Sequence, residues 1–162
     1  MVEGAVTQQP VDAVVTAANQ ALKGGGGVDA AVHRAAGKEL VRASRALAPC
    51  PTGSAVVTPA FELAPVRWVV HAVGPRYRGR PQDAELLASA YTSSLARVDE
   101  VGARSVAFPS ISTGVYGYPD EEAARVSVAA LRGATSDVER VVLVAFRERA
   151  AELWRRALDD AG

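Results

Sequence analysis

Four consecutive glycines, Gly24–Gly27, separate a short apolar segment from the start of a helix at Val28. The apolar segment ends in Thr16-Ala17-Ala18-Asn19, and the first turn of the helix carries Asp29. Glycines let the backbone approach a ligand closely and turn its N–H groups toward it. The helix start adds unpaired N–H donors and the positive end of the helix dipole. The segment indicates a phosphate or diphosphate site, although alone it fits a flexible surface loop equally well.

A second loop with the same features reads SISTGVYGYP and spans Ser110–Pro119. It follows an apolar segment, Ser105–Pro109, and leads into another helix start, where Pro119 precedes three acidic residues. Its hydroxyl groups and glycines could hold the other side of a diphosphate, and its two tyrosines could pack against a sugar. A turn whose tyrosines close the end of a sheet is the open alternative.

These two loops require strands and helices that bring them together. Segments rich in Val, several apolar on both faces, predict buried strands. The expected strands are Asp12–Thr16, Ser54–Pro59, Arg67–Val73, Ser105–Pro109 and Val138–Phe146. The expected helices are Val28–Leu47, which could break near Gly37, then Asp83–Val101, Pro119–Arg132 and Glu148–Leu158.

The alternation of strands and helices predicts an α/β fold with a mostly parallel sheet covered on both faces. The second and third expected strands are close enough in sequence to pair antiparallel, so the sheet is expected to be mixed. In open α/β sheets the ligand crevice lies beyond the carboxyl ends of the strands, where both glycine loops fall.

Length and composition restrict the class of protein. The chain has 162 residues and balanced charge, with 18 basic and 18 acidic residues, which is unlike a general nucleic-acid binder. We expect one domain over residues 1–162, no signal peptide, no membrane segment, and a cytoplasmic monomer. The single cysteine, Cys50, excludes a cysteine-cluster metal site. The basic cluster Arg76, Arg78 and Arg80 is interpreted as a solvated surface loop rather than a binding patch.

Four ordered motifs resemble those of macrodomains, in particular the MacroD-type branch. They are VVTAANQALKGGGGVDAAVHRAAG at residues 14–37, Cys50-Pro51-Thr52-Gly53, Val70-His71-Ala72-Val73-Gly74-Pro75, and the segment Ile111–Pro119. Their order and spacing make the resemblance far more specific than a single glycine run. It implies a three-layer α/β/α fold that binds ADP-ribose and hydrolyses ADP-ribosyl linkages, with no cofactor and no metal.

The resemblance also implies roles for individual residues. Asn19, which would bond a hydroxyl of the distal ribose, and Asp29, which would orient the sugar or an attacking water, are the expected catalytic residues. Phe146 stands where the family has an aromatic residue that stacks on adenine. The remaining expected ligand-binding residues line the diphosphate and distal ribose: Gly25, Gly26, Gly27 and Val28 in the first loop, and Ser112, Thr113, Gly114, Val115 and Tyr116 in the second.

Three positions depart from the family pattern. The family usually has Gly-Asp-Ile-Thr near the start, where the Asp accepts a hydrogen bond from adenine, but this chain has Gly4-Ala5-Val6-Thr7. Thr16 replaces the first Asn of the usual Asn-Ala-Ala-Asn. The sequence given begins almost at Gly4, so the first strand is expected to be short or missing. Weaker selectivity for adenine is the expected consequence of Ala5.

The expected function is a hydrolase that removes mono-ADP-ribose from acidic protein side chains or from O-acetyl-ADP-ribose by water attack at the distal ribose. The alternative from another class is a non-catalytic reader that only binds ADP-ribose. A third interpretation keeps the enzyme but places the ADP-ribose on a nucleic-acid base, so the expected partners are ADP-ribose, ADP-ribosylated protein and, on this interpretation, ADP-ribosylated DNA. Of the two histidines, His33 is expected to pack against the sheet rather than bond near the site, and His71 to be a core residue.

Overall fold

The centre of the fold is a six-stranded sheet in the order β1-β6-β5-β2-β4-β3, seen in a computed structural model that describes residues 1–161. The pairs formed by β1, β6, β5, β2 and β4 are parallel, and β3 pairs with β4 antiparallel. The predicted mixed, mostly parallel sheet is therefore confirmed. The strands are β1 (Val2–Glu3), β2 (Ala13–Ala17), β3 (Ala55–Pro59), β4 (Trp68–Ala72), β5 (Ser105–Phe108) and β6 (Arg140–Ala145).

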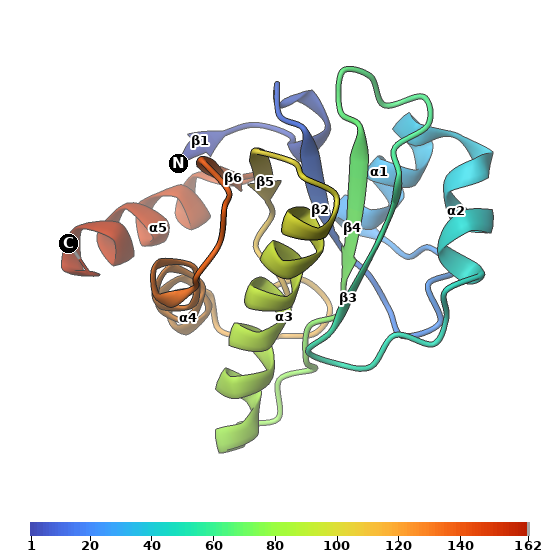
Figure 1. Cartoon of the computed structure of the whole chain (residues 1–162). Helices are drawn as coiled ribbons and strands as arrows, with labels where there is room; N and C mark the ends of the chain where they lie inside the picture. Colours follow the sequence, from blue (N-terminus) through green and yellow to red (C-terminus); the bar gives the residue numbers. More distant parts are fainter. Residues whose placement is uncertain (162) are drawn as a thin grey trace.

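Helices cover both faces of this sheet, as the alternation in the sequence predicts (Figure 1). One face carries η1 (Val6–Gln8), α1 (Gly27–Ala36) and α2 (Lys38–Arg45), and the other carries α3 (Pro81–Glu100), α4 (Asp120–Gly133) and α5 (Glu148–Ala161). Within the described residues, no helix is both long enough and apolar enough to cross a membrane. The result is the expected α/β/α arrangement of three layers.

Successive residues of the central strands supply the two cores. Val14 of β2 and Val69 of β4 pack with Val32 of α1, whereas Val15 and Val70 belong to the core beneath α3. All four strand residues are fully buried. Because adjacent side chains of a strand point to opposite faces, a strand covered on both sides is apolar at most positions, and its buried polar residues, here Thr16 and His71, have hydrogen-bond partners. This explains the continuous Val-rich segments of the sequence.

The first predicted helix is divided at Gly37, the break that the sequence left open. Gly37 has a φ of 92°, in the left-handed region that favours glycine, and a Cβ there would collide with the Glu62 side chain. The chain therefore ends α1 at Ala36 and begins α2 at Lys38. The first strand is short, as expected: β1 consists of Val2 and Glu3, which pair with the end of β6.

Candidate functional site

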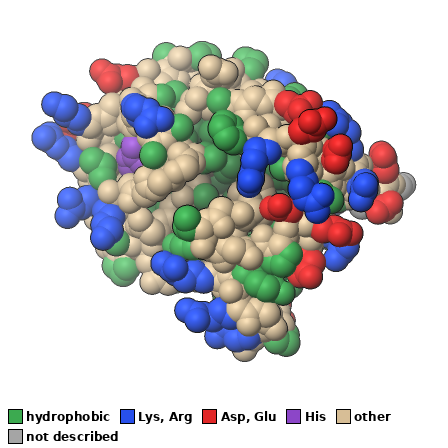
Figure 2. Space-filling model, turned by 180° about the vertical axis from the view of Figure 1, so that it is seen from behind, with side chains coloured by type: hydrophobic (Ala, Val, Ile, Leu, Met, Phe, Trp, Pro, Cys, Tyr) green, Lys and Arg blue, Asp and Glu red, His purple; other side chains and the backbone are tan. Residues whose placement is uncertain are grey.

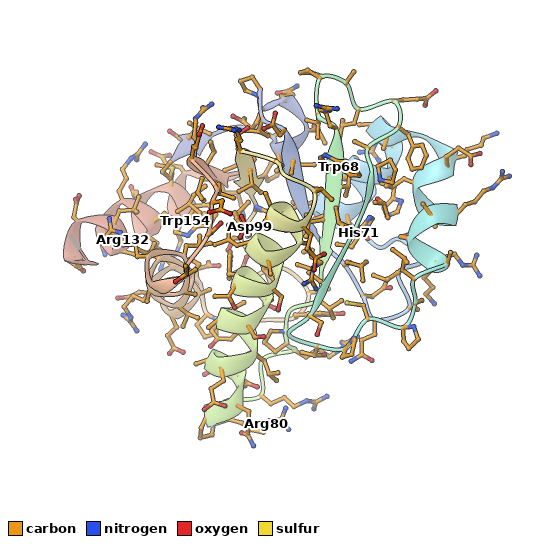
Figure 3. The ribbon with its side chains drawn as sticks, in the orientation of Figure 1. Trp68, His71, Arg80, Asp99, Arg132 and Trp154 are labelled. Atoms are coloured by element: carbon orange, nitrogen blue, oxygen red, sulfur yellow. The ribbon has the colours of Figure 1, made fainter. Side chains whose placement is uncertain are left out.

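The segments singled out from the sequence meet at one edge of the sheet. Strands β2, β4, β5 and β6 run in the same direction, so the loops that follow them emerge together. In Figure 3, Trp68 and His71 show the direction of β4, and Arg80 lies beyond its carboxyl end. Asn19 follows β2, Ser110 follows β5 and Phe146 follows β6. Both glycine loops thus lie on the same side of the molecule.

Asp29 is buried at the base of the first glycine loop, with 2% of its surface exposed. The Thr16 hydroxyl donates a 2.8 Å hydrogen bond to Asp29 Oδ1, and His33 Nε2 lies 3.4 Å from the same oxygen. Burial raises the pKa of the Asp29 carboxyl, while the Thr16 hydrogen bond, the His33 charge and the Gly25 N–H oppose this rise. The carboxylate is thus held in a fixed orientation inside the molecule.

Asn19 and Asp29 converge on Gly25. A Cβ built on Gly25 would lie 3.5 Å from Asp29 Oδ2 and 3.7 Å from Asn19 Nδ2. The Asn19 side chain also holds its own loop, because its Nδ2 donates a 2.9 Å hydrogen bond to the Gly24 carbonyl. The exposed glycines Gly25–Gly27 lead directly into α1, whose first turn contains Asp29. The structure therefore brings together the two expected catalytic residues and the first glycine loop.

The second loop is folded around Ser112, which is buried and has a φ of 69°. This left-handed backbone is strained for a residue other than glycine, and such strain occurs most often at functional sites. The Ser112 carbonyl accepts a 2.9 Å hydrogen bond from the Tyr118 N–H. Its Oγ has no hydrogen-bond partner among the described residues and lies against Gly74, where a Cβ would collide with it.

The tip of this loop presents the other expected ligand-binding residues. The Thr113 hydroxyl bonds back to Ser110, 3.0 Å from its Oγ, which fixes the turn. Gly114 and Val115 are exposed, Val115 at 97%. Tyr116 is partly buried, and the Arg76 guanidinium carbon lies 4.6 Å from the centre of its ring. Four of the five residues thus lie at or near the surface, while Ser112 forms the interior of the turn.

Phe146 lies directly beyond β6 with 79% of its surface exposed. The register of β1 against β6 places Glu3 opposite Ala145, and the Gly4 N–H donates to the Ala145 carbonyl at 3.0 Å. Phe146 is thus one residue beyond the last β1–β6 pair, and Ala5, where the family usually has Asp, is two residues beyond it. The exposed Phe146 ring lies at the same edge of the sheet as the two loops. It follows β6, the neighbour of β5, and the second loop follows β5.

Asp29, His33 and His71 form a buried polar cluster, with their ligand atoms within 4.8 Å of one another. His71 is fully buried, its Nε2 lies 3.0 Å from the Thr58 hydroxyl, and burial lowers its pKa to about 3. The expected core role of His71 is confirmed. The Thr16 hydroxyl donates a hydrogen bond to Asp29, and the Thr58 hydroxyl shares one with His71.

Two features of this edge go beyond what the sequence predicts. The sequence favours packing against the sheet for His33, whereas in the structure Nε2 of this residue lies 3.4 Å from Asp29 Oδ1. Arg76, Arg78 and Arg80 are exposed in a loop, as expected, and all three also line a pocket of about 360 Å³. The missed signal is their position, because they follow the carboxyl end of β4, at the edge where both glycine loops lie.

Comparison with known proteins agrees with this geometry. A family model described as Macro domain matches residues 15–127. The chain is 48% identical over 157 residues to Macro domain-containing protein RSc0334 of Ralstonia nicotianae, which covers 96% of this chain and 91% of the relative. It is 45% identical over 170 residues to the O-acetyl-ADP-ribose deacetylase of Salmonella gallinarum. This alignment covers 100% of this chain and 94% of the relative.

A solved structure supports the same assignment. A mutant macrodomain of Oceanobacillus iheyensis with ADPR superimposes with a TM-score of 0.93 at 38% sequence identity, covering 99% of this chain and 91% of that chain. The relatives and the solved structure match nearly the whole length of the chain, and the family model matches residues 15–127. The chain belongs to the macro domain family.

Proposed function

We propose that this protein is a hydrolase that releases ADP-ribose from O-acetyl-ADP-ribose and from mono-ADP-ribosylated acidic side chains. The observation that carries the proposal is the buried Asp29 carboxylate, held by Thr16 where the glycine loop enters α1 and next to Asn19. The relative of Salmonella gallinarum, named as an O-acetyl-ADP-ribose deacetylase, supports the reaction class. The Oceanobacillus iheyensis structure with ADPR supports the ligand.

The two glycine loops bind the diphosphate of the ligand in this proposal. Backbone N–H groups of Gly25–Val28 and the start of α1 contact it from one side. Those of Ser112–Val115 contact it from the other, and the Tyr116 ring packs against the distal ribose. Phe146 stacks on the adenine base at the far end of the sheet edge. Ala5 offers adenine no side-chain acceptor, so binding of the base rests on stacking, which discriminates weakly between bases.

On an ADP-ribosylated side chain, the reaction takes place at the anomeric carbon of the distal ribose; on O-acetyl-ADP-ribose, the water attacks the carbonyl carbon of the ester, the ribose hydroxyl leaves and acetate is released. Asn19 bonds a ribose hydroxyl, and the Asp29 carboxylate orients the sugar and an attacking water. When the side-chain linkage breaks, the sugar acquires oxocarbenium character, which the nearby carboxylate stabilises. Asp29 is the one carboxylate within the two loops, so a pair of carboxylates is not the basis of this mechanism. A phosphate oxygen of the ligand accepts the proton of the water.

Turnover of two substrates by the purified protein tests the proposal. The protein is incubated with O-acetyl-ADP-ribose and, separately, with a protein mono-ADP-ribosylated on acidic side chains. Release of ADP-ribose is followed by chromatography, and binding of ADP-ribose by calorimetry. We expect binding and turnover of at least one substrate. No turnover of either substrate at micromolar protein would overturn the proposal.

A non-catalytic reader of ADP-ribose is the second candidate, and the burial of Asp29 favours it. With 2% of its surface exposed and one oxygen bonded to Thr16, this side chain offers little free surface to a water. A reader binds ADP-ribose tightly but releases none from either substrate. Replacing Asp29 in a reader changes affinity alone, so the same pair of measurements separates the two candidates.

Removal of the Phe146 ring is expected to weaken ADP-ribose binding about tenfold or more. Stacking of a base on an aromatic side chain contributes about 1–3 kcal/mol. Because the ring is 79% exposed, Phe146→Ala is expected to leave the fold intact. Calorimetric titration with ADP-ribose measures the change.

Phe61→Ala is the matched control for this titration. Phe61 is 43% exposed and follows β3, whose antiparallel direction places it at the opposite edge of the sheet. The control should bind like the unmodified protein. Equal affinity of the Phe146→Ala variant and the unmodified protein would show that adenine does not stack on this ring.

A further inference from the structure

A fully buried tyrosine on α3, Tyr91, has no role in the mechanism above. Its ring packs against Phe108, the last residue of β5, with the two ring centres 5.3 Å apart. Its hydroxyl accepts a 3.0 Å hydrogen bond from the Ile111 N–H and donates one of 3.3 Å to the Pro109 carbonyl. One phenol group thus holds the backbone on both sides of Ser110, where the second glycine loop begins.

This hydroxyl lies among buried polar groups that come from three helices. The Trp154 indole N–H of α5 donates a 3.0 Å hydrogen bond to the Ser127 hydroxyl of α4, and Figure 3 shows Trp154 next to that helix. Burial raises the pKa of Tyr91, and the Ile111 N–H and the Ser127 hydroxyl oppose this rise only in part. The Tyr91 hydroxyl therefore keeps its proton at neutral pH and can donate it to a carbonyl.

The interior gives these groups no access to water. Figure 2 shows charged side chains spread over the surface, where water solvates them, whereas Tyr91, Ser127 and Trp154 are at most 2% exposed. A buried polar group that loses its partner remains unsatisfied, at a cost in free energy. The hydrogen bonds of Tyr91 to the loop are therefore more valuable than bonds of the same length at the surface.

The strained backbone of Ser112 shows why the loop needs this support. Its φ of 69° is unfavourable for a residue other than glycine, and such a conformation persists only where neighbouring contacts fix it. The Tyr118 N–H fixes it from one side, through a 2.9 Å hydrogen bond to the Ser112 carbonyl. Tyr91 fixes it from the other side, through the Ile111 N–H. The direction of the N–H groups of Ser112–Val115 depends on both bonds.

We infer that Tyr91 is a positioning residue for the second glycine loop, an inference that rests on the proposed function. Its hydroxyl holds the loop in the conformation that binds the diphosphate, although a fully buried side chain contacts neither the ligand nor the reacting atoms. Without the hydroxyl, the Ile111 N–H and the Pro109 carbonyl lose this partner, and part of the population leaves the binding conformation. The apparent affinity for ADP-ribose then falls in proportion to the population that remains.

Removal of a single hydroxyl tests the inference. Tyr91→Phe removes it and keeps the ring against Phe108. Its matched control is Ser94→Ala, which removes a fully buried hydroxyl from the same helix, where it bonds the Ala90 carbonyl at 2.7 Å. We expect Tyr91→Phe to raise the Kd of ADP-ribose about threefold to tenfold and Ser94→Ala to leave it unchanged. Calorimetry measures both at a temperature where thermal unfolding shows all three proteins to be folded.

Hydrogen exchange of the ligand-free protein gives a readout that needs no turnover. The Tyr118 N–H lies at the far end of the strained turn and does not bond Tyr91, so its exchange reports on the loop as a whole. We expect it to exchange about threefold to tenfold faster in Tyr91→Phe and at an unchanged rate in Ser94→Ala. The diphosphate is bound in the ground state and the transition state alike, so KM for O-acetyl-ADP-ribose should rise while kcat stays nearly constant.

Two results would contradict the role of Tyr91. One is an unchanged Kd of ADP-ribose in Tyr91→Phe, whether or not the Tyr118 N–H exchanges faster. The other is an equal loss of affinity in Tyr91→Phe and Ser94→Ala, which would indicate a general weakening of α3. Failure of the proposed function looks different, because the unmodified protein then binds ADP-ribose but turns over neither substrate, and the affinities and exchange rates still decide the inference.

Discussion

The Asp29→Ala variant is expected to release ADP-ribose about 10²–10⁴-fold more slowly than the unmodified protein, the usual contribution of a positioned acid or base. The carboxylate is the one acidic group within the two glycine loops, and its neighbours Asn19 and Gly25 lie at the same point. Binding of ADP-ribose should largely survive, because the backbone N–H groups of both loops remain. Single-turnover measurements with O-acetyl-ADP-ribose and calorimetry with ADP-ribose separate the two effects.

A second variant, Asp29→Asn, separates the loss of charge from the loss of side-chain volume. It keeps the size of the side chain and an oxygen to accept the Thr16 hydrogen bond. It removes the charge and replaces one acceptor oxygen by an NH2 group, so we expect it to lose rate nearly as much as Asp29→Ala while unfolding at a higher temperature than Asp29→Ala. Thermal unfolding of all three proteins verifies that lost rate is not lost structure. An Asp29→Asn variant with nearly full activity would show that the carboxylate is not part of the reaction.

The architecture was predictable because its signals are local. Val-rich segments such as 141–146 are apolar at consecutive positions, as a short strand covered on both faces requires, and helical segments separate them. The ends of elements were less predictable: β6 begins at Arg140 rather than at Val138. End residues depend on pairing with a neighbouring strand, and no pattern within the segment itself reports such pairing.

The site was predictable only in part, for the same reason. The glycine run and Asp29 are neighbours in sequence, so their proximity follows from a single turn of chain. The contact of Thr16 with Asp29 also spans few residues, but which oxygen the hydroxyl bonds depends on how β2 meets α1. The pocket joins Arg76 and Arg78 with Tyr116, about forty residues away, and only the parallel order of β2, β4 and β5 brings them together. In the sequence, Tyr116 is far from the basic cluster, so the pocket that they share could not be predicted.

Replacement of Thr16 by Val is expected to lower the free energy of unfolding by about 1.5–3 kcal/mol at neutral pH, the usual contribution of a hydrogen bond to a charged group. Val keeps the shape of Thr but cannot donate to Asp29 Oδ1, and both residues are buried. The bond favours the ionised carboxyl, so its loss raises the pKa of Asp29 further. Urea unfolding measures the change in stability, and Thr16→Ser, which retains the hydroxyl, is the control.

The dependence on pH distinguishes this explanation from a general packing defect. Burial already raises the pKa of Asp29 above its ordinary value, so the folded protein binds a proton there more readily than the unfolded chain does. The contribution of this group to stability therefore increases as the pH falls through the pKa of the folded protein. The loss of stability in Thr16→Val should consequently be largest at neutral pH, and its free energy of unfolding should approach that of the unmodified protein at acidic pH.

Activity should depend on pH in a related way. If Asp29 must be ionised for turnover, the acidic limb of the activity profile should also move to higher pH in Thr16→Val and not in Thr16→Ser. A stability difference that is equal at every pH would mean that the hydroxyl serves packing rather than the charge of Asp29.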